Sequence, residues 1–403
     1  MADSRSDSVL PLLSLAAILS VLLLDYGSVQ ANRIVAGVGH SLWSALGSGL
    51  ATLLLLSLLA ILVLNSLPNL SLLTKLKLAR LKPHRYSKLY SYTLLLFLLL
   101  QMPFGLAWFA AIQIPESQPF ARAAPGAGFW LLLFFSFLML LELQRSTAHR
   151  HWLGLGIGLS TLAAWWLCLQ LGWLDSLALV REYRSQQGPF KQALQSHLLL
   201  VGGTLLLSAL LGGLLTALIL NFRSLQSSVF ALLNFLQTIP SIALFSLLIA
   251  PLSALSMQFP WLQSLGIRGI GWAPALIALV AYSLLPMVRN CTVALQQVSA
   301  EVLQSAQAMG MNRVQLFFQV RLPLALPVMI EGLRITCIQA IGLTAVAALI
   351  GTGGFGNFIF QGLGQAAMDL ILLGALPIIA LAMVADYLFS AAAKYWQPGV
   401  SHD

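Results

Sequence analysis

The sequence predicts an all-α, polytopic membrane protein with about ten transmembrane helices. Only 8% of the 403 residues are charged and 59% are hydrophobic, whereas about 25% of the residues of an ordinary soluble domain are charged. Charge-free windows recur along the chain, and a span needs about 20 apolar residues. These windows are Ser8–Leu24, Ile34–Thr74, Leu89–Pro115, Ala123–Leu141, Trp152–Leu174, Gln192–Phe222, Ser224–Ile267, Gly269–Val288, Thr336–Met368 and Leu370–Ala385.

Some windows do not match a single span. Ile34–Thr74 and Ser224–Ile267 are each long enough for a span plus an apolar surface segment. The ninth span is expected to begin before its window, near Ala325. The first apolar run lacks a clear basic leading region and a small-residue cleavage site, so we expect it to be retained as a span.

The distribution of basic residues predicts the orientation, because cytoplasmic loops are enriched in lysine and arginine. The loop after the second span carries the largest basic cluster: Lys75, Lys77, Arg80, Lys82, Arg85 and Lys88. If both termini are cytoplasmic, most basic residues fall on that side, and the minority outside is Arg33, Arg122, Arg181, Arg184, Lys191 and Arg268. Topology and anionic lipid therefore explain the net charge of +9, and no nucleic-acid partner is needed.

A polar stretch divides the chain. Asp175–Gln195 is the longest polar segment expected on the outer side. Leucine-rich spans with few motifs precede it, and every recognisable motif follows it. We therefore predict an accessory membrane region at 1–190 and a transport core at 191–403. Three cysteines, Cys168, Cys291 and Cys337, lie far apart in apolar runs, so we expect neither a metal site nor a disulfide framework.

One segment of the core, Glu301–Pro327, is polar and helix-compatible. It predicts an amphipathic helix of about three to four turns, too short and too polar to span a bilayer. Gly310 predicts the end of this helix, and Pro323 and Pro327 predict a turn before the next span. The apolar side chains of its helical wheel are Leu295, Val298, Val302, Leu303, Ala306 and Met309.

This segment resembles the EAA loop of the inner-membrane permeases of binding-protein-dependent ABC importers. The first half of that motif matches Gln304, Ser305, Ala306 and Gly310, and the second matches Val320, Leu322 and Pro323, with the spacing preserved. The resemblance implies a type I ABC importer permease core whose cytoplasmic coupling helix, near 299–311, docks on an ATPase. Gln304 replaces the acid of the family, and Glu301, on the same face, could supply that charge. The alternative is an ordinary interfacial helix between two spans. The residues expected to couple to the ATPase are Glu301, Gln304, Ser305, Ala306, Gly310, Leu322 and Pro323.

Polar residues also accompany a proline inside the core. Pro240 predicts a kink in its span, and Gln237 and Thr238 bring polar groups to the same depth. These residues predict a translocation path, with interhelical hydrogen bonding as the open alternative. The ring faces of Phe245 and Tyr282 could attract a quaternary ammonium by about 0.5–2 kcal/mol. Small residues in the preceding span predict a tight helix contact; they are Gly202, Gly203, Gly212 and Gly213.

Three strings resemble permeases of the osmoprotectant importers, which carry glycine betaine, choline and related compounds: Q-T-I-P-S-I-A-L, A-L-I-A-L-V-A-Y-S-L-L-P-M-V-R-N and A-A-L-I-G-T-G-G-F-G. This resemblance implies a permease subunit in a bacterial inner membrane, with a second permease copy or relative, two ATP-binding subunits and a periplasmic binding protein. No G-K-[S/T] string is present, so ATP is expected on the partner ATPase and no cofactor on this chain. The glycine-rich string predicts a flexible turn at the outer gate, or a helix stop, at Gly351, Gly353, Gly354 and Gly356.

Two alternative function classes are an ion-coupled secondary transporter and a membrane-embedded enzyme. An ion-coupled secondary transporter needs buried acids, and only Asp386, in the last span, suggests one. We expect Tyr387 or Lys394 to satisfy it, and Glu331 and Arg334 to pair at i and i+3. An enzyme needs a catalytic constellation, and the spans show no clustered histidines, paired acids or metal-ligand spacing.

Overall fold

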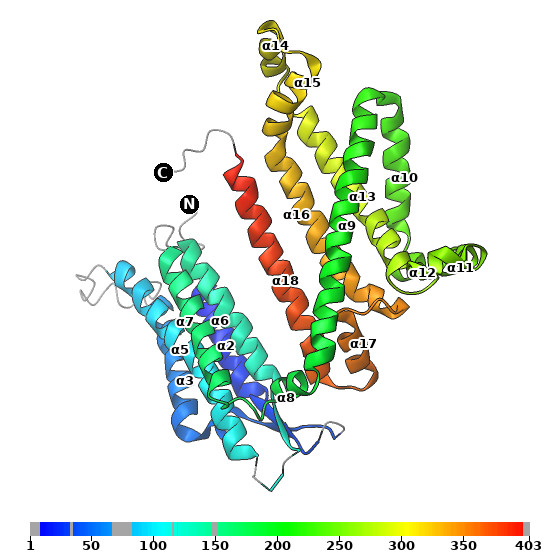
Figure 1. Cartoon of the computed structure of the whole chain (residues 1–403). Helices are drawn as coiled ribbons and strands as arrows, with labels where there is room; N and C mark the ends of the chain where they lie inside the picture. The colour runs from blue at the N-terminus through cyan, green and yellow to red at the C-terminus, as the bar shows by residue number, and fades with distance from the viewer. Residues whose placement is uncertain are drawn as a thin grey trace. The chain divides into compact units, whose positions relative to one another are not determined.

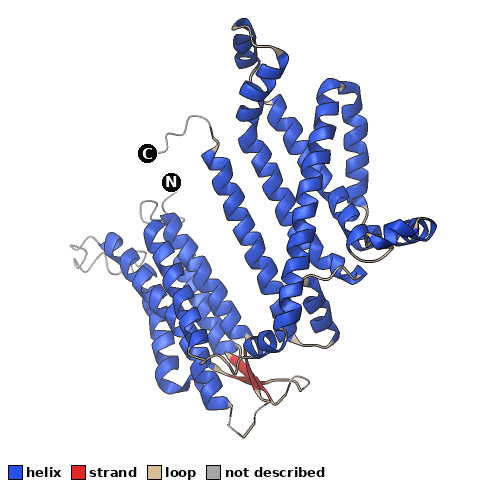
Figure 2. Cartoon of the chain, viewed as in Figure 1, coloured by secondary structure: helices blue, strands red, loops and turns tan. Residues whose placement is uncertain are grey.

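Helices make up nearly all the regular structure of this chain (Figures 1 and 2). The computed structural model describes residues 9–32, 35–66, 83–114, 117–118, 120–146 and 151–397. The chain divides into two compact units, Met1–Ser185 and Gln186–Asp403. The predicted orientation rests in part on residues outside this description, namely Arg33, Lys75, Lys77, Arg80 and Lys82.

The first unit is a bundle of apolar helices. Tyr26, Phe109 and Phe129 are its largest fully buried side chains, and the rings of Tyr26 and Phe129 meet edge to face with centroids 5.6 Å apart. Burial raises the pKa of the Tyr26 hydroxyl, which lies between the first helix and the first strand. The helices are α2 (Val9–Leu23), α3 (Leu42–Ser66), α5 (Pro83–Gln113), α6 (Ala127–Ser146), α7 (His151–Gln170) and α8 (Ala178–Ser185).

A small antiparallel sheet closes one end of this bundle, in the strand order β2-β1-β3 (Figure 2). Gly27 of β1 pairs with His40 of β2 on one side and with Pro125 of β3 on the other. The sequence analysis did not anticipate these strands, because segments of three or four residues are too short for an alternating pattern to be read. The strands are β1 (Gly27–Gln30), β2 (Val38–His40) and β3 (Arg122–Pro125).

The polar stretch near Asp175 folds onto this sheet through ion pairs. Arg122 of β3 contacts the buried carboxylate of Glu182 in α8 at 3.3 Å. Arg184 binds both carboxylate oxygens of Asp175, at 2.8 and 2.6 Å. The pKa of Arg181 is lowered, chiefly by burial and also by Arg122, with Asp175 partly opposing the shift. Charge pairing therefore fixes α8 at the end of the first unit.

The second unit contains two helical runs of more than 30 residues, Gln187–Asn221 and the continuous run Arg313–Ile350. Figure 1 shows α9, α10, α13, α16 and α18 running lengthwise, with α14 at one end of the unit and α17 at the other. The elements are α9 (Gln187–Asn221), η3 (Arg223–Leu225), α10 (Gln226–Thr238), α11 (Ser241–Gln258), α12 (Pro260–Ser264), α13 (Trp272–Gln296), α14 (Ala300–Ala308), α15 (Arg313–Gln315), the π-helix η4 (Leu316–Arg321), α16 (Leu322–Ala347), η5 (Ala348–Ile350), α17 (Gly356–Gly364) and α18 (Met368–Tyr395).

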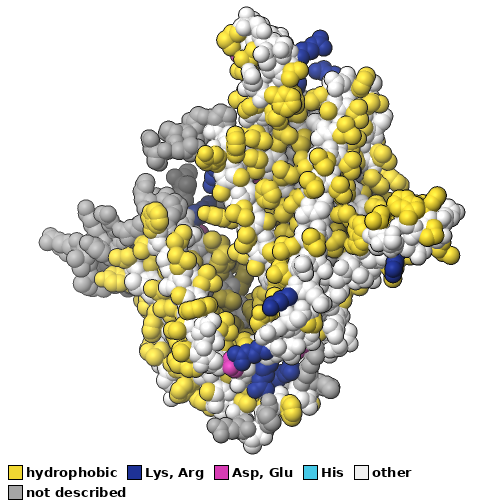
Figure 3. Space-filling view, in the orientation of Figure 1, with side chains coloured by type: hydrophobic (Ala, Val, Ile, Leu, Met, Phe, Trp, Pro, Cys, Tyr) yellow, Lys and Arg dark blue, Asp and Glu magenta, His cyan; other side chains and the backbone are white. Residues whose placement is uncertain are grey.

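The prediction of a polytopic helical membrane protein is confirmed. Within the described residues, nine helices are long and apolar enough to cross a membrane, and α2 is a shorter apolar helix of 15 residues. Hydrophobic side chains cover the lengths of these helices in Figure 3, and lysine and arginine side chains lie mainly near helix ends. Such a surface suits contact with lipid along the spans and with water at their ends.

The window Ser224–Ile267 differs from the prediction. The expected kink at Pro240 is a complete break: α10 ends at Thr238, Ile239 is extended with φ −72° and ψ 127°, and α11 begins at Ser241. The reason is that proline disfavours helical backbone in the residue before it. In Figure 1, α11 then points away from the direction that α9, α10 and α13 share.

Helix α13 is the core of the second unit. It packs against α9 and α16 along much of its length and also contacts α10 and α11. At Gly212 of α9 the approach is close, because an added Cβ would lie 2.7 Å from Cγ of Met287 in α13. The predicted tight contact is therefore confirmed at Gly212, whereas Gly202 and Gly213 have open space around them.

Replacing Gly212 with valine should lower the stability of the second unit by about 1–3 kcal/mol, because the new side chain overlaps Met287. The matched control is Gly202→Val on the same helix, where nothing lies within 4 Å. Thermal unfolding in detergent measures both. Equal midpoints for the two variants would show that α9 and α13 do not depend on this contact.

Candidate functional site

The segment predicted to couple to an ATPase forms the helix α14. Ser299 caps its start, where its hydroxyl accepts a hydrogen bond from the Val302 amide at 3.3 Å. Its nine residues are fewer than the expected three to four turns, because Leu295 still belongs to α13 and the linker between the two helices takes up the next residues. The helix ends at Met309, as the glycine that follows it predicts.

Gly310 terminates α14 through a paired backbone arrangement. Its amide donates to the Gln307 carbonyl at 2.9 Å, and the Met311 amide donates to the Ala306 carbonyl at 3.3 Å. This is a Schellman motif, which places the residue after the cap in the left-handed region. Gly310 has φ +86°, which glycine adopts without strain. The motif sets the direction in which the chain leaves α14.

The predicted coupling residues are exposed on α14, except for one. Ala306 is 3% exposed and faces inward, whereas Glu301, Gln304, Ser305 and Gly310 are all exposed. Two apolar side chains, Val302 near the start of α14 and Met309 at its C-cap, are also exposed, the latter by 74%. The helix therefore presents a mixed polar and apolar surface at one end of the unit (Figure 1). Its role in docking remains a prediction.

The connection from α14 to the next span is not the expected proline-marked turn. After a capping box between Asn312 and Gln315, the chain is helical from Arg313 to Ile350, a rod of 38 residues. The span thus begins twelve residues before the expected Ala325. Pro323 falls in the first turn of α16, directly after the π-helix η4. The Leu322 amide donates to the carbonyl of Phe317, five residues back, as in a π-helix. The proline ring at Pro323 is therefore accommodated without a break in the helix.

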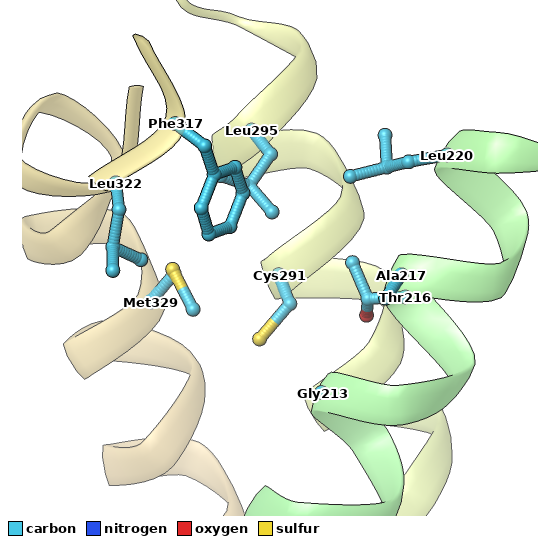
Figure 4. A pocket seen from close by; sticks show the side chains of 9 residues that line it. All are labelled: Gly213, Thr216, Ala217, Leu220, Cys291, Leu295, Phe317, Leu322 and Met329. Atoms are coloured by element: carbon cyan, nitrogen blue, oxygen red, sulfur yellow. The ribbon is translucent and has the colours of Figure 1, made fainter. Parts of the chain in front are cut away.

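A hydrogen bond ties this rod to α13. Nε of Arg321 donates to the carbonyl of Leu295 in the last turn of α13, at 2.9 Å. Beside this tether lies an apolar cavity of about 120 Å³ between α9, α13, η4 and α16. Figure 4 shows Phe317, Leu322, Met329 and Cys291 pointing into it. A packing gap here leaves the π-helix room to shift, because close-packed interiors otherwise resist displacement.

The break at Pro240 is fixed by two hydrogen bonds to α13. The Gln237 amide donates to the carbonyl of Tyr282 at 2.8 Å, and the Tyr282 hydroxyl donates to the carbonyl of Ile239. That carbonyl lies where the helix stops, so no helical amide can bond to it. Thr238 satisfies its hydroxyl locally, on the carbonyl of Phe235. Interhelical hydrogen bonding, the open alternative at these positions, is thus present at Gln237.

The two aromatic residues predicted for the path lie in a packed core. Phe245 is 1% exposed and Tyr282 is 5% exposed. Both belong to a cluster with Leu200, Leu279 and Ala347. Their ring faces pack against neighbouring helices in this arrangement, whereas Thr238 and Pro240 are exposed.

A polar hollow of about 220 Å³ lies beside Gln237. Its other polar residues are Arg289 and Asn290 of α13 and Gln339 of α16, and its apolar walls are Leu285, Pro286 and Ile335. Arg289, Asn290 and Gln339 are not among the residues predicted for the path. The available signal was a cation and an amide directly after the apolar window that ends at Val288, together with an amide three residues after the start of the next window.

The glycine-rich segment lies at the end of the unit opposite α14 (Figure 1). The helical run ends at Gly351, with φ +79°, which confirms the predicted helix stop. Gly353 and Gly354 also have positive φ, and an added Cβ at Gly354 would lie 3.3 Å from Nδ1 of His197 in α9. Gly356 begins α17, where an added Cβ would overlap the carbonyl oxygen of Ala345. The segment is closely packed on its neighbours, and its role as an outer gate remains a prediction.

The acid of the last span pairs with α16, not with the residues expected. Nε of Arg334 donates to Asp386 at 2.7 Å, and its terminal nitrogen contacts Glu331 at 2.8 Å. The predicted Glu331–Arg334 pair is confirmed, whereas Tyr387 and Lys394 as partners of Asp386 are wrong. The Asp386 side chain is 45% exposed and easily reached by the long arginine. No group of three histidine, cysteine or acidic residues that could hold a metal occurs in the part of the chain described.

Comparisons with known proteins match both units. The family described as "Binding-protein-dependent transport system inner membrane component" matches residues 209–402. A second family, "ABC transporter permease YehY, N-terminal domain", matches residues 5–180.

Three relatives are bacterial permeases. The chain is 34% identical to the glycine betaine/carnitine/choline transport system permease protein OpuCD of Bacillus subtilis, over 53% of this chain and 87% of that protein. It is 32% identical to the choline transport system permease protein OpuBD of the same organism, over 54% and 90%. It is 37% identical to the osmoprotectant import permease protein OsmW of Salmonella typhimurium, over 48% and 84%.

Removing either hydrogen bond at the Pro240 break should destabilise the chain by about 1–2 kcal/mol, because a buried carbonyl loses its donor. Tyr282→Phe and Gln237→Leu test the two bonds, and Thr238→Val, whose hydroxyl bonds only within its own helix, is the control. Thermal unfolding of the two single variants and of the Tyr282→Phe/Gln237→Leu double variant gives the coupling free energy between the two hydrogen bonds. We expect the double variant to lose less unfolding free energy than the sum of the two single losses. Strictly additive losses would mean that the two hydrogen bonds act independently at the Pro240 break.

Proposed function

Because the chain belongs to the family of binding-protein-dependent transport system inner membrane components, we propose that it is the permease subunit of an ATP-driven importer for osmoprotectants such as glycine betaine or related quaternary amines. The family is a multi-pass component of inner-membrane transport systems. In this role the chain provides the translocation path and leaves ATP hydrolysis to a separate subunit.

One observation carries the coupling proposal: the exposed helix α14 is followed, after the short turn at Gly310, by an unbroken helical rod that contains the span α16. At about 1.5 Å per residue, 38 residues extend about 57 Å, nearly twice the roughly 30 Å of a hydrocarbon core. The rod therefore extends beyond the lipid and carries α14 with it. A force on Glu301, Gln304 or Ser305 from a docked ATPase is transmitted to the rod through the turn at Gly310 and through the contact of α14 with η4.

The proposal also includes the partners. The assembly contains two ATP-binding subunits, which hold the ATP, and a second permease copy or relative. A periplasmic binding protein delivers the solute at the opposite end, where the glycine-rich segment Gly351–Gly356 forms the outer gate. Both termini and α14 then face the cytoplasm. The three relatives named above, whose names give importers of quaternary amines and osmoprotectants, support the substrate class.

The division of labour between the units is part of the proposal. The relatives match about half of this chain and most of their own length, and the transport family model lies within the second unit. The transport core therefore lies in the second unit, and the first is an accessory membrane region. Within the core, the path passes the Pro240 joint, with Gln237 and Thr238 beside it, and the Phe245 and Tyr282 rings support the joint.

Gly310→Val should uncouple ATP hydrolysis from uptake, because valine strains the left-handed backbone that ends α14. We expect uptake to fall by about tenfold or more while membrane insertion is retained, since a strain of about 1–2 kcal/mol redirects the connection and leaves the spans alone. Gly310→Asn is the matched control, because asparagine tolerates this conformation. The measurement is uptake per ATP hydrolysed by the reconstituted assembly. A normal ratio in the valine variant counts against α14 as the coupling helix.

A second test separates this function from ion-coupled secondary transport. Purified permease with its ATPase and binding protein should take up glycine betaine into proteoliposomes only with ATP, and a protonophore or sodium ionophore should not change the rate. Asp386→Asn should retain most of the uptake, because the acid pairs with Arg334 in a structural contact. Uptake that collapses with the ionophore, or with Asp386→Asn in a stably folded variant, would support ion coupling instead.

A further inference from the structure

The hollow beside Gln237 contains a cation without a partner. Among the residues that the structure describes, Arg289 makes neither an ion pair nor a hydrogen bond. Asn290 is committed to the carbonyl of Pro286 at 2.8 Å, and Gln237 gives its amide to Tyr282. The guanidinium of Arg289 and the amide of Gln339 therefore keep their hydrogen-bonding capacity for something that enters the hollow.

Arg289 is exposed where α13 borders the hollow, so its guanidinium is accessible to a ligand that enters. It lies seven residues before the end of α13, which places its Cα about 10 Å along the helix axis from that end. Ionisable groups inside membrane segments face cavities and pair with opposite charges, because hydrocarbon does not solvate them. The group that suits a guanidinium best is a carboxylate, which accepts two parallel N–H bonds from its planar fork.

The rest of the hollow suits a small amphipathic molecule. Leu285, Pro286 and Ile335 supply apolar walls, which tolerate methyl groups, and Gln339 supplies an amide. Because the three contributing helices are α10, α13 and α16, the hollow adjoins both the Pro240 joint and the rod that carries α14. A change in the position of either would reshape it.

We propose that this hollow binds the carboxylate end of a zwitterionic solute during passage, with Arg289 as the carboxylate ligand and Gln339 beside it. The inference rests on the proposed importer function and narrows its substrate class. A quaternary amine that carries a carboxylate, such as glycine betaine, is attracted to Arg289. Choline has the same trimethylammonium group and no carboxylate, so the arginine repels its net charge. The permease therefore adds its own selection to that of the binding protein.

The test compares two solutes in the reconstituted assembly, each supplied with saturating binding protein. Arg289→Gln should lower glycine betaine uptake by about tenfold or more, as expected for losing a charge-assisted carboxylate contact, and should change choline uptake by less than about threefold. The glycine betaine uptake of Arg289→Lys should lie between the rates of the unaltered protein and of Arg289→Gln. The matched control is Arg223→Gln, an exposed cation outside the hollow, which should leave both rates unchanged. Equal loss for both solutes, or no loss for either, overturns the proposal.

Anionic lipid offers the same chemistry as the solute, so each assay is run in vesicles of phosphatidylcholine alone and with anionic lipid added. An Arg289→Gln effect that occurs only with anionic lipid assigns the arginine to a headgroup and overturns the proposal. Arg289→Gln removes an unpaired charge, so we expect its unfolding midpoint to equal or exceed that of the unaltered protein.

A binding measurement keeps this inference separate from the importer function itself. Ile335 lines the hollow and is 49% exposed, whereas Cys168, Cys291 and Cys337 are buried. In the purified assembly without binding protein, glycine betaine should protect an Ile335→Cys thiol from a polar thiol reagent, and choline should not. Adding Arg289→Gln should abolish this protection. If glycine betaine protects the thiol but neither solute is transported, the importer assignment is wrong and the proposed binding site is supported. If glycine betaine does not protect the thiol, the proposed binding site is wrong.

Discussion

The constraint on which the second unit depends is the continuity of the helix that starts at Arg313. It passes through a π-helix and two prolines without a break, and the Arg321–Leu295 hydrogen bond joins its first turns to α13. Because α14 connects to this helix by a short turn and packs against η4, we expect α14 and the span α16 to move together. The apolar cavity at Phe317 and Met329 leaves this junction less tightly packed than the helices below it. We therefore expect the helix from Arg313 to Ile350 to tilt as one body about the loosely packed region at Phe317 and Met329.

A second joint lies at Pro240, on the other side of α13. Proline ends α10, and the hydrogen bonds of Gln237 and of the Ile239 carbonyl with Tyr282 fix this end of the break to α13. In lipid such polar groups need protein partners, because no water replaces a lost hydrogen bond. The polar hollow lies between these two joints, and its lining residues come from the helices that each joint controls. Movement at the coupling end is therefore expected to alter the hollow, which links the helix from Arg313 to Ile350 to solute passage.

Much of this could be predicted from the sequence, and the rest failed for identifiable reasons. Low charge density predicted the spans, and Gly310 predicted the end of α14, because both signals are local. The π-helix was missed, since two prolines normally indicate a break and only the observed Leu322–Phe317 hydrogen bond shows how the chain avoids one. The Arg334–Asp386 pair joins residues that are distant in sequence. The hollow needs three helices in contact, so the polar residues at Arg289 and Gln339 did not by themselves indicate a shared site. The strands near Gly27 were too short to recognise.

The most direct measurement is site-specific cross-linking of α14 in the intact assembly. A cysteine introduced at Gln304, which is exposed on this helix, is combined with cysteines placed across the surface of the ATPase that faces the membrane. The account predicts a rapid disulfide between the permease and the ATPase, with a yield that changes when ATP binds, and labelling of the same thiol only from the cytoplasmic side. A Gln304 cysteine that is labelled from the periplasm, or that never cross-links to the ATPase, would contradict it.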